Sequence, residues 1–388
     1  MTTSPVRHSA ADLLRFCEEH RDDMLGGLKT MVELESPSDN KAALDRLGEH
    51  LALEFERLGG KVTIHPQADA GDNLAAEFPG RSGVKPVLLL GHFDTVWPLG
   101  TLAGMPFRVE GGRVRGPGVL DMKAGISMMM LALRALRAAG SHSDHRPVIV
   151  VLDTDEEVGS TTGRPLVEAT AKRSEAVLVL EPAQGLAGHL KTARKGVGDF
   201  TIRVTGRASH AGVDFEKGHS AIVELARQIL DVSKFTDISR GITVNPGVIQ
   251  GGTRPNVVAA EAQATIDIRI ARAADAAELR EKFAALRPYN PECSLEVRGA
   301  INRPPMERTE GTVRLFRLAQ EQAAKLGMPL EESATGGGSD GNFTSALGIP
   351  TLDGLGGVGE GAHAEHESVL IGELARRTAL LASVIANI

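Results

Sequence analysis

The sequence predicts an α/β fold, in which a mainly parallel, doubly wound domain carries an inserted ferredoxin-like α+β domain. Two continuous apolar runs, Pro147–Asp153 and Ala176–Leu180, are typical of strands that are covered on both faces. Segments with helical spacing alternate with such runs, which favours parallel strands joined by helices. After Glu181 the expected elements follow the order β-α-β-β-α-β, which is the ferredoxin-like pattern.

The first part of the chain predicts amphipathic helices, short strands and one buried helix. Ala11–Leu34 has apolar residues near helical spacing, and a Ser-Pro-Ser sequence follows it. Met122–Ala139 is apolar almost all round in its first turns, so we expect it to be buried against the sheet. The other elements expected here are the helix Ala42–Leu58, capped by two glycines, and the strands Lys61–His65, Asn73–Phe78 and Val84–Leu90.

The second part of the chain predicts the inserted domain and then a return to the first pattern. From about Thr309 a long helix to Leu326, a glycine-rich turn and a final helix Ile371–Ile385 follow. The simplest arrangement is one α/β domain from residues 1–193 and 306–388, with residues 194–305 inserted. The elements expected in the insert are strands at 196–206, 241–250 and 262–270, and helices at 220–232 and 276–286.

Composition excludes several classes of protein. The chain has 388 residues and a net charge of -7 without long basic runs, which argues against nucleic acid and anionic membrane surfaces as partners. Aromatic residues make up 3% of the chain, so side chains for base stacking are scarce. Cys17 and Cys293 lie far apart, so we expect reduced, buried thiols and no disulfide framework.

The sequence also predicts where the protein resides. No stretch approaches the roughly 18 apolar residues that a membrane helix needs. Met1–Ala11 carries Ser, Thr, Arg and His where an export signal has an apolar run. We therefore expect a cytoplasmic protein.

Polar side chains follow three of the expected strands. His92 comes after an apolar run, Asp155-Glu156-Glu157 after a second, and Glu181 after a third. The carboxyl ends of parallel strands meet at one edge of a sheet, which is where ligands bind in open α/β folds. His, Asp and Glu are ligands of zinc-like cations. On their own the acidic triplet could be a solvated turn and Glu181 a plain strand end, but the buried strands before them favour a shared site.

Five motifs occur in order along nearly the full length of the chain. They are His92-Phe93-Asp94-Thr95-Val96, Gly116-Pro117-Gly118 with Asp121-Met122-Lys123-Ala124-Gly125, Asp155-Glu156-Glu157-Val158-Gly159, Ala208-Ser209-His210-Ala211-Gly212 and Gly336-Gly337-Gly338-Ser339-Asp340. In these motifs the chain resembles the M20 family of di-zinc peptidases and aminoacylases, and it is most similar to the glutamate carboxypeptidase branch. Glycines 336–338 do not form a phosphate loop, because no Lys-Ser or Lys-Thr follows them.

The resemblance implies two divalent metal ions per chain, with zinc expected and cobalt or manganese as alternatives. It implies that Asp121 bridges the two ions. One ion is then held also by His92 and Glu181, and the other by Glu157 and His363.

The resemblance further implies hydrolysis by metal-activated water, with Glu156 as general base. A carboxylate beside the ligand Glu157 but off the metals suits that role. Asp94, two residues after His92, suits the role of holding the imidazole in one tautomer. His363 is preferred to His366 as the ligand on the family's spacing alone.

In the inserted domain, the resemblance implies that His210 stabilises the oxyanion and, in dimeric members, reaches the neighbouring subunit's site. This predicts a homodimer. Arg269 and Asn256 match positions that hold the substrate's α-carboxylate, and a guanidinium suits a planar carboxylate. Gly337 and Gly338 leave backbone close to the substrate.

The predicted function is therefore a carboxypeptidase-type hydrolase that acts on a small peptide or an N-acyl amino acid next to a free α-carboxylate. An N-acyl-amino-acid deacylase shares every metal residue and is the alternative. A metal-binding scaffold without activity is disfavoured because Glu156 is present together with the five ligands. A dinucleotide-dependent oxidoreductase is disfavoured because no Gly-x-Gly-x-x-Gly follows the first strand.

Overall fold

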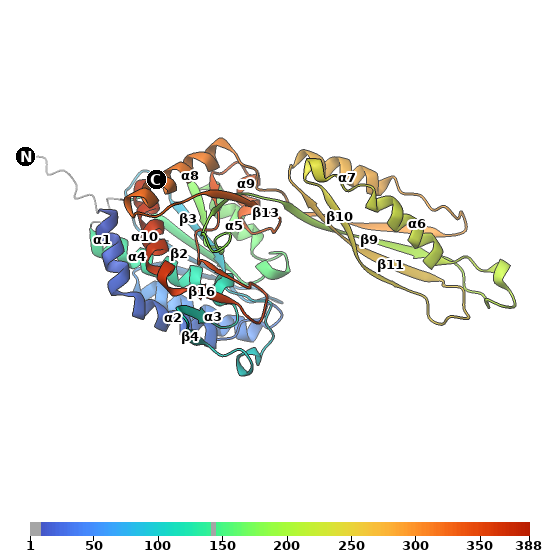
Figure 1. Cartoon of the computed structure of the whole chain (residues 1–388), viewed down its shortest axis with the longest axis horizontal. Helices are drawn as coiled ribbons and strands as arrows, with labels where there is room; N and C mark the ends of the chain where they lie inside the picture. The colour runs from blue at the N-terminus through green and yellow to red at the C-terminus, as the bar shows by residue number, and fades with distance from the viewer. Residues whose placement is uncertain (1–8, 141–144) are drawn as a thin grey trace, which may run out of the picture. The chain divides into compact units, whose positions relative to one another are not determined.

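The computed structural model describes residues 9–140 and 145–388 (Figure 1). They form two compact units. The larger contains the described residues up to Ala193 with Arg308–Thr335 and Ser339–Ile388, and the smaller contains Arg194–Glu307 with Gly336–Gly338. Residues 1–8, on which the expectation of a chain without an export signal largely depends, lie outside the described part. Of the described helices, none is both long and apolar enough to cross a membrane.

The larger unit is built on a six-stranded sheet with the order β1-β2-β6-β3-β7-β14. Strands β6, β3, β7 and β14 run parallel to one another, and β1 and β2 form an antiparallel edge. The predicted mainly parallel α/β fold is confirmed. The strands are β1 (Lys61–His65), β2 (Asn73–Phe78), β3 (Val87–His92), β6 (Val148–Asp153), β7 (Ala176–Val179) and β14 (Thr351–Leu352).

Helices cover both faces of this sheet. Strands β3 and β6 are buried along their full length. Because successive side chains point to opposite faces, Leu89 enters one core and Leu88 the other, which explains their continuous apolar sequences. The first core includes side chains of α1 (Ala10–Glu19), α2 (Arg21–Glu33), α3 (Lys41–Arg57), α4 (Ala124–Ala139), α8 (Glu310–Lys325) and α10 (Ile371–Asn387), and the second those of α5 (Arg164–Lys172), which contacts α9 (Gly341–Ala346).

The single helix predicted over Ala11–Leu34 is wrong, because the chain forms two helices that break at His20. The His20 ring stacks on Phe16 at 4.0 Å, and its Nδ1 lies 2.8 Å from the Phe16 carbonyl oxygen. This contact occupies a carbonyl at the end of α1. Asp22 and Asp23 then favour a new helix start through the helix dipole.

Two small sheets were not predicted, since strands this short show no periodicity. One has the order β15-β16-β5-β4 and the other pairs β13 with β8. The pairing of β16 with β5 places the chain after His363 beside the chain before Asp121. The strands are β4 (Arg108–Glu110), β5 (Arg113–Arg115), β8 (Leu190–Arg194), β13 (Glu332–Thr335), β15 (Gly359–Glu360) and β16 (Ser368–Leu370).

The smaller unit is an antiparallel sheet with the order β10-β11-β9-β12 and two helices (Figure 1). The chain order β-α-β-β-α-β with this strand order is the ferredoxin-like topology. Both helices pack their apolar side chains into one core with the sheet. The elements are β9 (Gly196–Thr205), α6 (Ala221–Ser233), β10 (Thr243–Gly251), β11 (Glu261–Ile270), α7 (Ala274–Ala284) and β12 (Ser294–Arg303).

Both cysteines are buried free thiols, as expected. Burial raises the pKa of the Cys17 thiol to about 12. This thiol therefore stays protonated near neutral pH and behaves as a small apolar side chain.

Candidate metal centre

Three neighbouring parallel strands deliver polar side chains to one edge of the larger sheet. His92 is the last residue of β3. The turn Glu156–Val158 follows β6 after two intervening residues, and Glu181 follows β7 closely. Because β6, β3 and β7 are parallel, these three carboxyl ends meet at the same edge.

The Asp121 carboxylate lies between two histidines. Its Oδ1 is 3.3 Å from His92 Nε2, and its Oδ2 is 3.4 Å from His363 Nε2. Each histidine has a second carboxylate beside it. Glu181 Oε1 lies 3.4 Å from His92 Nε2, and a Glu157 oxygen lies 3.1 Å from His363 Nε2.

These residues therefore form two sets of donors that share Asp121. The ion-pair distances place His92 and Glu181 in one set and His363 and Glu157 in the other. Two groups of donor atoms within 4.8 Å of one another, His92 with Asp121 and Glu157 and His92 with Glu156 and Glu181, have His92 in common. Within the described part of the chain, His92 Nε2 and Asp121 Oδ1 are buried atoms without a hydrogen-bond partner. Unpaired buried nitrogen and carboxylate donors at these spacings fit a pair of divalent cations.

The electrostatics of the cluster agree with this interpretation. Asp121 and Glu157 raise the pKa of His363 to about 10. Burial alone lowers the pKa of His92, but the neighbouring carboxylates of Asp121, Asp94 and Glu181 outweigh burial and raise it well above its usual value. The protonated imidazoles thus supply the positive charge that the carboxylates need. Divalent cations supply the same charge and bind neutral imidazoles, so metal binding releases these protons.

Asp94 supports both His92 and the glutamate pair. It is fully buried, and its Oδ1 lies 3.1 Å from His92 Nδ1. The backbone N–H groups of Glu156 and Glu157 donate to it at 3.3 and 3.2 Å. Ser38 Oγ donates to Asp94 Oδ2 at 2.7 Å. The contacts of Asp94 with Ser38 and with the backbone of Glu156 and Glu157 could not be predicted from the sequence, because they join segments that are far apart along the chain.

The structure brings His363, and not His366, to the carboxylates. His363 has a positive φ of 62°, and its Nε2 lies 3.1 Å from Glu157 and 3.4 Å from Asp121. The His366 ring lies against Gly361, where an added Cβ would approach it to 2.8 Å. Four residues after His363, the buried Glu367 accepts a hydrogen bond from the Asp121 backbone at 3.1 Å.

The remaining candidate residues belong to the smaller unit. His210 and Asn256 are exposed neighbours, because Ala211 N donates to the Asn256 carbonyl at 3.0 Å. Arg269, near the end of β11, pairs with Asp267 at 2.8 Å. The carbonyls of Gly337 and Gly338 accept hydrogen bonds from Arg194 at 3.3 and 2.8 Å.

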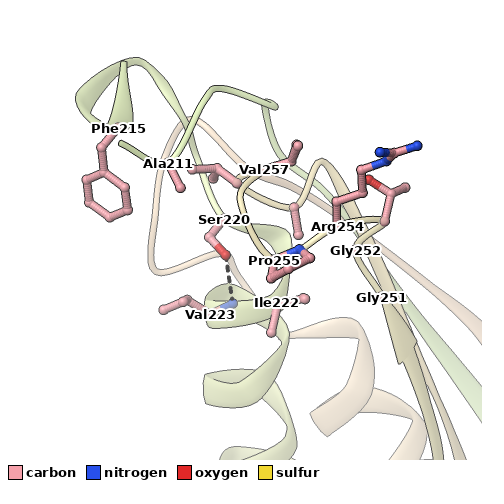
Figure 2. A pocket seen from close by; sticks show the side chains of 13 residues that line it. Ala211, Phe215, Ser220, Ile222, Val223, Gly251, Gly252, Arg254, Pro255 and Val257 are labelled. Atoms are coloured by element: carbon pink, nitrogen blue, oxygen red, sulfur yellow. Dashed lines mark hydrogen bonds between the residues drawn. The ribbon is translucent and has the colours of Figure 1, made fainter. Parts of the chain in front are cut away.

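A groove of about 530 Å³ lies beside the His210 and Asn256 segments in the smaller unit (Figure 2). Figure 2 shows the start of α6, which faces the loop after β10. The Ser220 hydroxyl there accepts a hydrogen bond from Val223 N. Apolar side chains that line the groove are exposed, with an exposed fraction of 66% for Phe215 and 54% for Val223. The groove therefore presents apolar surface to the surroundings.

Comparisons with known proteins agree with the architecture. A model of peptidase family M20/M25/M40 matches residues 88–387. Carboxypeptidase G2 from Pseudomonas sp. (strain RS-16) is 31% identical over 385 residues, covering 97% of this chain and 92% of that protein. Succinyl-diaminopimelate desuccinylase from Xanthomonas campestris pv. campestris (strain 8004) is 29% identical, and the alignment covers 87% of this chain and 93% of that protein.

Among solved structures, an M20 family metallo-carboxypeptidase from Sulfolobus solfataricus has the same fold. Its TM-score is 0.75 at 16% sequence identity, and the alignment covers 94% of this chain and 99% of that one. The family match spans most of the sequence, and the similarity to carboxypeptidase G2 extends over nearly all of it. The chain therefore belongs to peptidase family M20/M25/M40 and is a hydrolase of the metallo-carboxypeptidase and amidohydrolase type.

Proposed function

We propose that this protein is a two-metal hydrolase that cleaves an amide bond next to a free α-carboxylate, as a carboxypeptidase does. The observation that carries the proposal is the Asp121 carboxylate, whose two oxygens face His92 and His363 separately. Asp121 would be shared by two ions, of which one would be held also by His92 and Glu181 and the other by His363 and Glu157. Zinc is the proposed metal, with cobalt or manganese as alternatives.

Metal ions held by these residues supply Lewis acidity and lower the pKa of water. Glu156 removes a proton from the attacking water and later delivers it to the leaving amine nitrogen. The backbone N–H of Glu156 donates to Asp94, and this hydrogen bond keeps the Glu156 carboxylate beside the donor cluster. Asp94 also holds His92 in the tautomer that leaves Nε2 free for a cation.

Residues of the smaller unit bind the substrate in this proposal. His210 donates to the carbonyl oxygen as negative charge develops on it. Arg269 and Asn256 bind the free α-carboxylate, and Gly337 and Gly338 leave room for the substrate backbone. The bidentate contact of Arg269 with Asp267 orients the guanidinium.

The similarity to carboxypeptidase G2 supports a peptide-like substrate. The similarity to a desuccinylase supports the alternative, an N-acyl-amino-acid deacylase, which uses the same metal residues. Rates on dipeptides and on N-acyl amino acids, measured with zinc, manganese and cobalt, separate the two. A carboxypeptidase prefers the dipeptides, and a substrate without a free α-carboxylate is a poor substrate of either enzyme.

We also propose a homodimer, because two substrate-binding groups lie at opposite ends of the smaller sheet. His210 forms an isolated β-bridge with Val257, which lies in the chain shortly before Glu261, the first residue of β11. Arg269 is the penultimate residue of that strand. A strand from Glu261 to Arg269 spans about 26 Å at about 3.3 Å per residue, so one small substrate cannot contact both ends. A second copy that contributes His210 together with the neighbouring Asn256 resolves this, and the exposed apolar groove beside His210 supplies surface for its contact.

The central experiment replaces Glu156 by Gln. We expect E156Q to lower kcat by about 10²- to 10⁴-fold, while metal content stays near two ions per chain. E157Q is the contrast, because loss of a ligand should lower metal content as well. Metal analysis after desalting and steady-state kinetics measure both effects. E156Q with wild-type turnover would contradict the role of Glu156.

A further inference from the structure

Glu367 is a fully buried carboxylate that accepts four hydrogen bonds. Its Oε1 accepts from the backbone N–H groups of Leu120 at 2.8 Å and Asp121 at 3.1 Å. Its Oε2 accepts from the backbone N–H of Gly118 at 3.0 Å and from Trp97 Nε1 at 2.9 Å. A carboxylate offers about four acceptor positions, so these donors use its full capacity.

The turn that carries Asp121 depends on these acceptors. Asp121 has φ −114° and ψ 94° inside the turn Val119–Lys123, and Gly118 before it is left-handed with φ 69°. Such a backbone does not form the repeating hydrogen bonds of a helix, and buried N–H groups need partners. Glu367 supplies them, and an ionised acceptor makes the bonds stronger than a neutral one.

Glu367 also belongs to the segment that carries His363. Two backbone hydrogen bonds of 2.8 Å, from Ala364 N to Gly361 O and from Glu367 N to Ala364 O, close this segment into a tight turn. Directly after Glu367, β16 pairs with β5. The carboxylate thus joins the backbone of Asp121 to the turn of His363, which are far apart in sequence.

We propose that Glu367 is a positioning residue of the metal centre, which holds Asp121 at a fixed place relative to His363. This inference rests on the proposed function, since it takes both residues as ligands. Both oxygens of Asp121 must point to separate cations, and a small rotation of its backbone would misdirect one of them. Trp97, bound to Glu367 Oε2, connects the segment after His92 to the same carboxylate.

The test is E367Q in the full-length protein. Gln has the shape of Glu, but its amide has one acceptor oxygen and one NH₂ donor, so in either orientation the NH₂ faces two N–H groups. We expect zinc affinity, measured on chelator-treated protein against a chromophoric competitor, to fall by about 10- to 100-fold. We also expect the visible absorption spectrum of the Co²⁺-loaded protein to change.

E224Q is a matched control. Glu224 is 2% exposed and accepts hydrogen bonds from the backbone N–H groups of Tyr289 and Asn290 at 3.0 and 2.9 Å. It lies in the smaller unit, within a buried network of the same kind. We expect E224Q to lower the melting temperature as E367Q does, but to keep wild-type zinc affinity and the wild-type cobalt spectrum.

A folded E367Q with wild-type zinc affinity and an unchanged cobalt spectrum overturns the inference. If E367Q does not fold, E367D tests the inference instead. The shorter Asp side chain keeps the charge but cannot reach all four N–H groups. Wild-type affinity in E367D overturns the inference, and weakened affinity supports it. A wild-type protein that binds no metal refutes the proposed function itself, so the two failures are distinguishable.

Discussion

Asp121 differs from the other proposed ligands because each of its carboxylate oxygens faces a different histidine. His92 and Glu181 lie on one side of it, and Glu157 and His363 on the other. Burial raises the pKa of Asp121, but the neighbouring imidazoles of His363 and His92 outweigh burial and hold it well below its usual value. The residue is therefore ionised at any physiological pH and is available to cations on both sides.

We predict that D121N binds neither metal firmly, because each set of donors loses its shared carboxylate. H363A should keep the ion at His92 and Glu181 and lose the other. Metal analysis of the desalted variants measures the number of ions per chain. H366A is the matched control, since the His366 ring lies against Gly361, and it should keep both ions. Two ions retained in D121N would argue against a bridging role.

At the scale of elements, the start of helix α4 packs directly on the end of β7. A Cβ added at Gly125 would lie 2.1 Å from the carbonyl oxygen of Leu180. Leu180 immediately precedes Glu181, so the space beside Gly125 helps to set the position of a proposed ligand. Gly26 in α2 is a contrast, because it is exposed and an added Cβ there would meet no atom within 4 Å.

We predict opposite effects for two glycine-to-alanine changes. G125A should lower the free energy of unfolding by about 1–3 kcal/mol through overpacking, and should weaken metal binding by displacing Glu181. G26A should raise the free energy of unfolding by about 0.5–1 kcal/mol, because Ala is the better helix former. Chemical denaturation of both variants measures these values. Equal stability of the two variants would refute the packing argument.

At the scale of the whole molecule, the proposed dimer determines which chain supplies His210 to a given site. Co-expression of H210A with E156Q, under different tags, allows the hybrid dimer to be purified. If His210 acts on the partner subunit's site, the hybrid contains one complete site and we expect about half of the wild-type activity. Each variant alone should be strongly impaired, since losing an oxyanion donor lowers kcat by about 10²- to 10³-fold.

The same hybrid distinguishes the opposite arrangement. If His210 served its own chain, one site of the hybrid would lack His210 and the other would lack Glu156, so the hybrid would be as impaired as its parents. Size-exclusion chromatography with light scattering gives the mass in solution. A monomeric wild-type protein with full activity would refute the dimer.

The sequence by itself determined the sheet and the kinds of residue at its edge. Apolar runs such as Pro147–Asp153 are local patterns, and burial on both faces requires them, so such strands and a mainly parallel sheet were predictable. The break at His20 was not, because it depends on a ring that stacks on Phe16 and lies against its carbonyl, and no glycine or proline marks it.

Only the tertiary structure decided how the edge residues meet. The side-chain chemistry of His363 and His366 is the same, and only the family's spacing favoured His363; in the structure it is His363 Nε2 that lies 3.1 Å from Glu157. The contacts of Asp94 with the glutamate backbone, and of Glu367 with the Asp121 turn, join residues that are distant along the chain. Such contacts follow from the packing of whole elements, which local spacing does not contain.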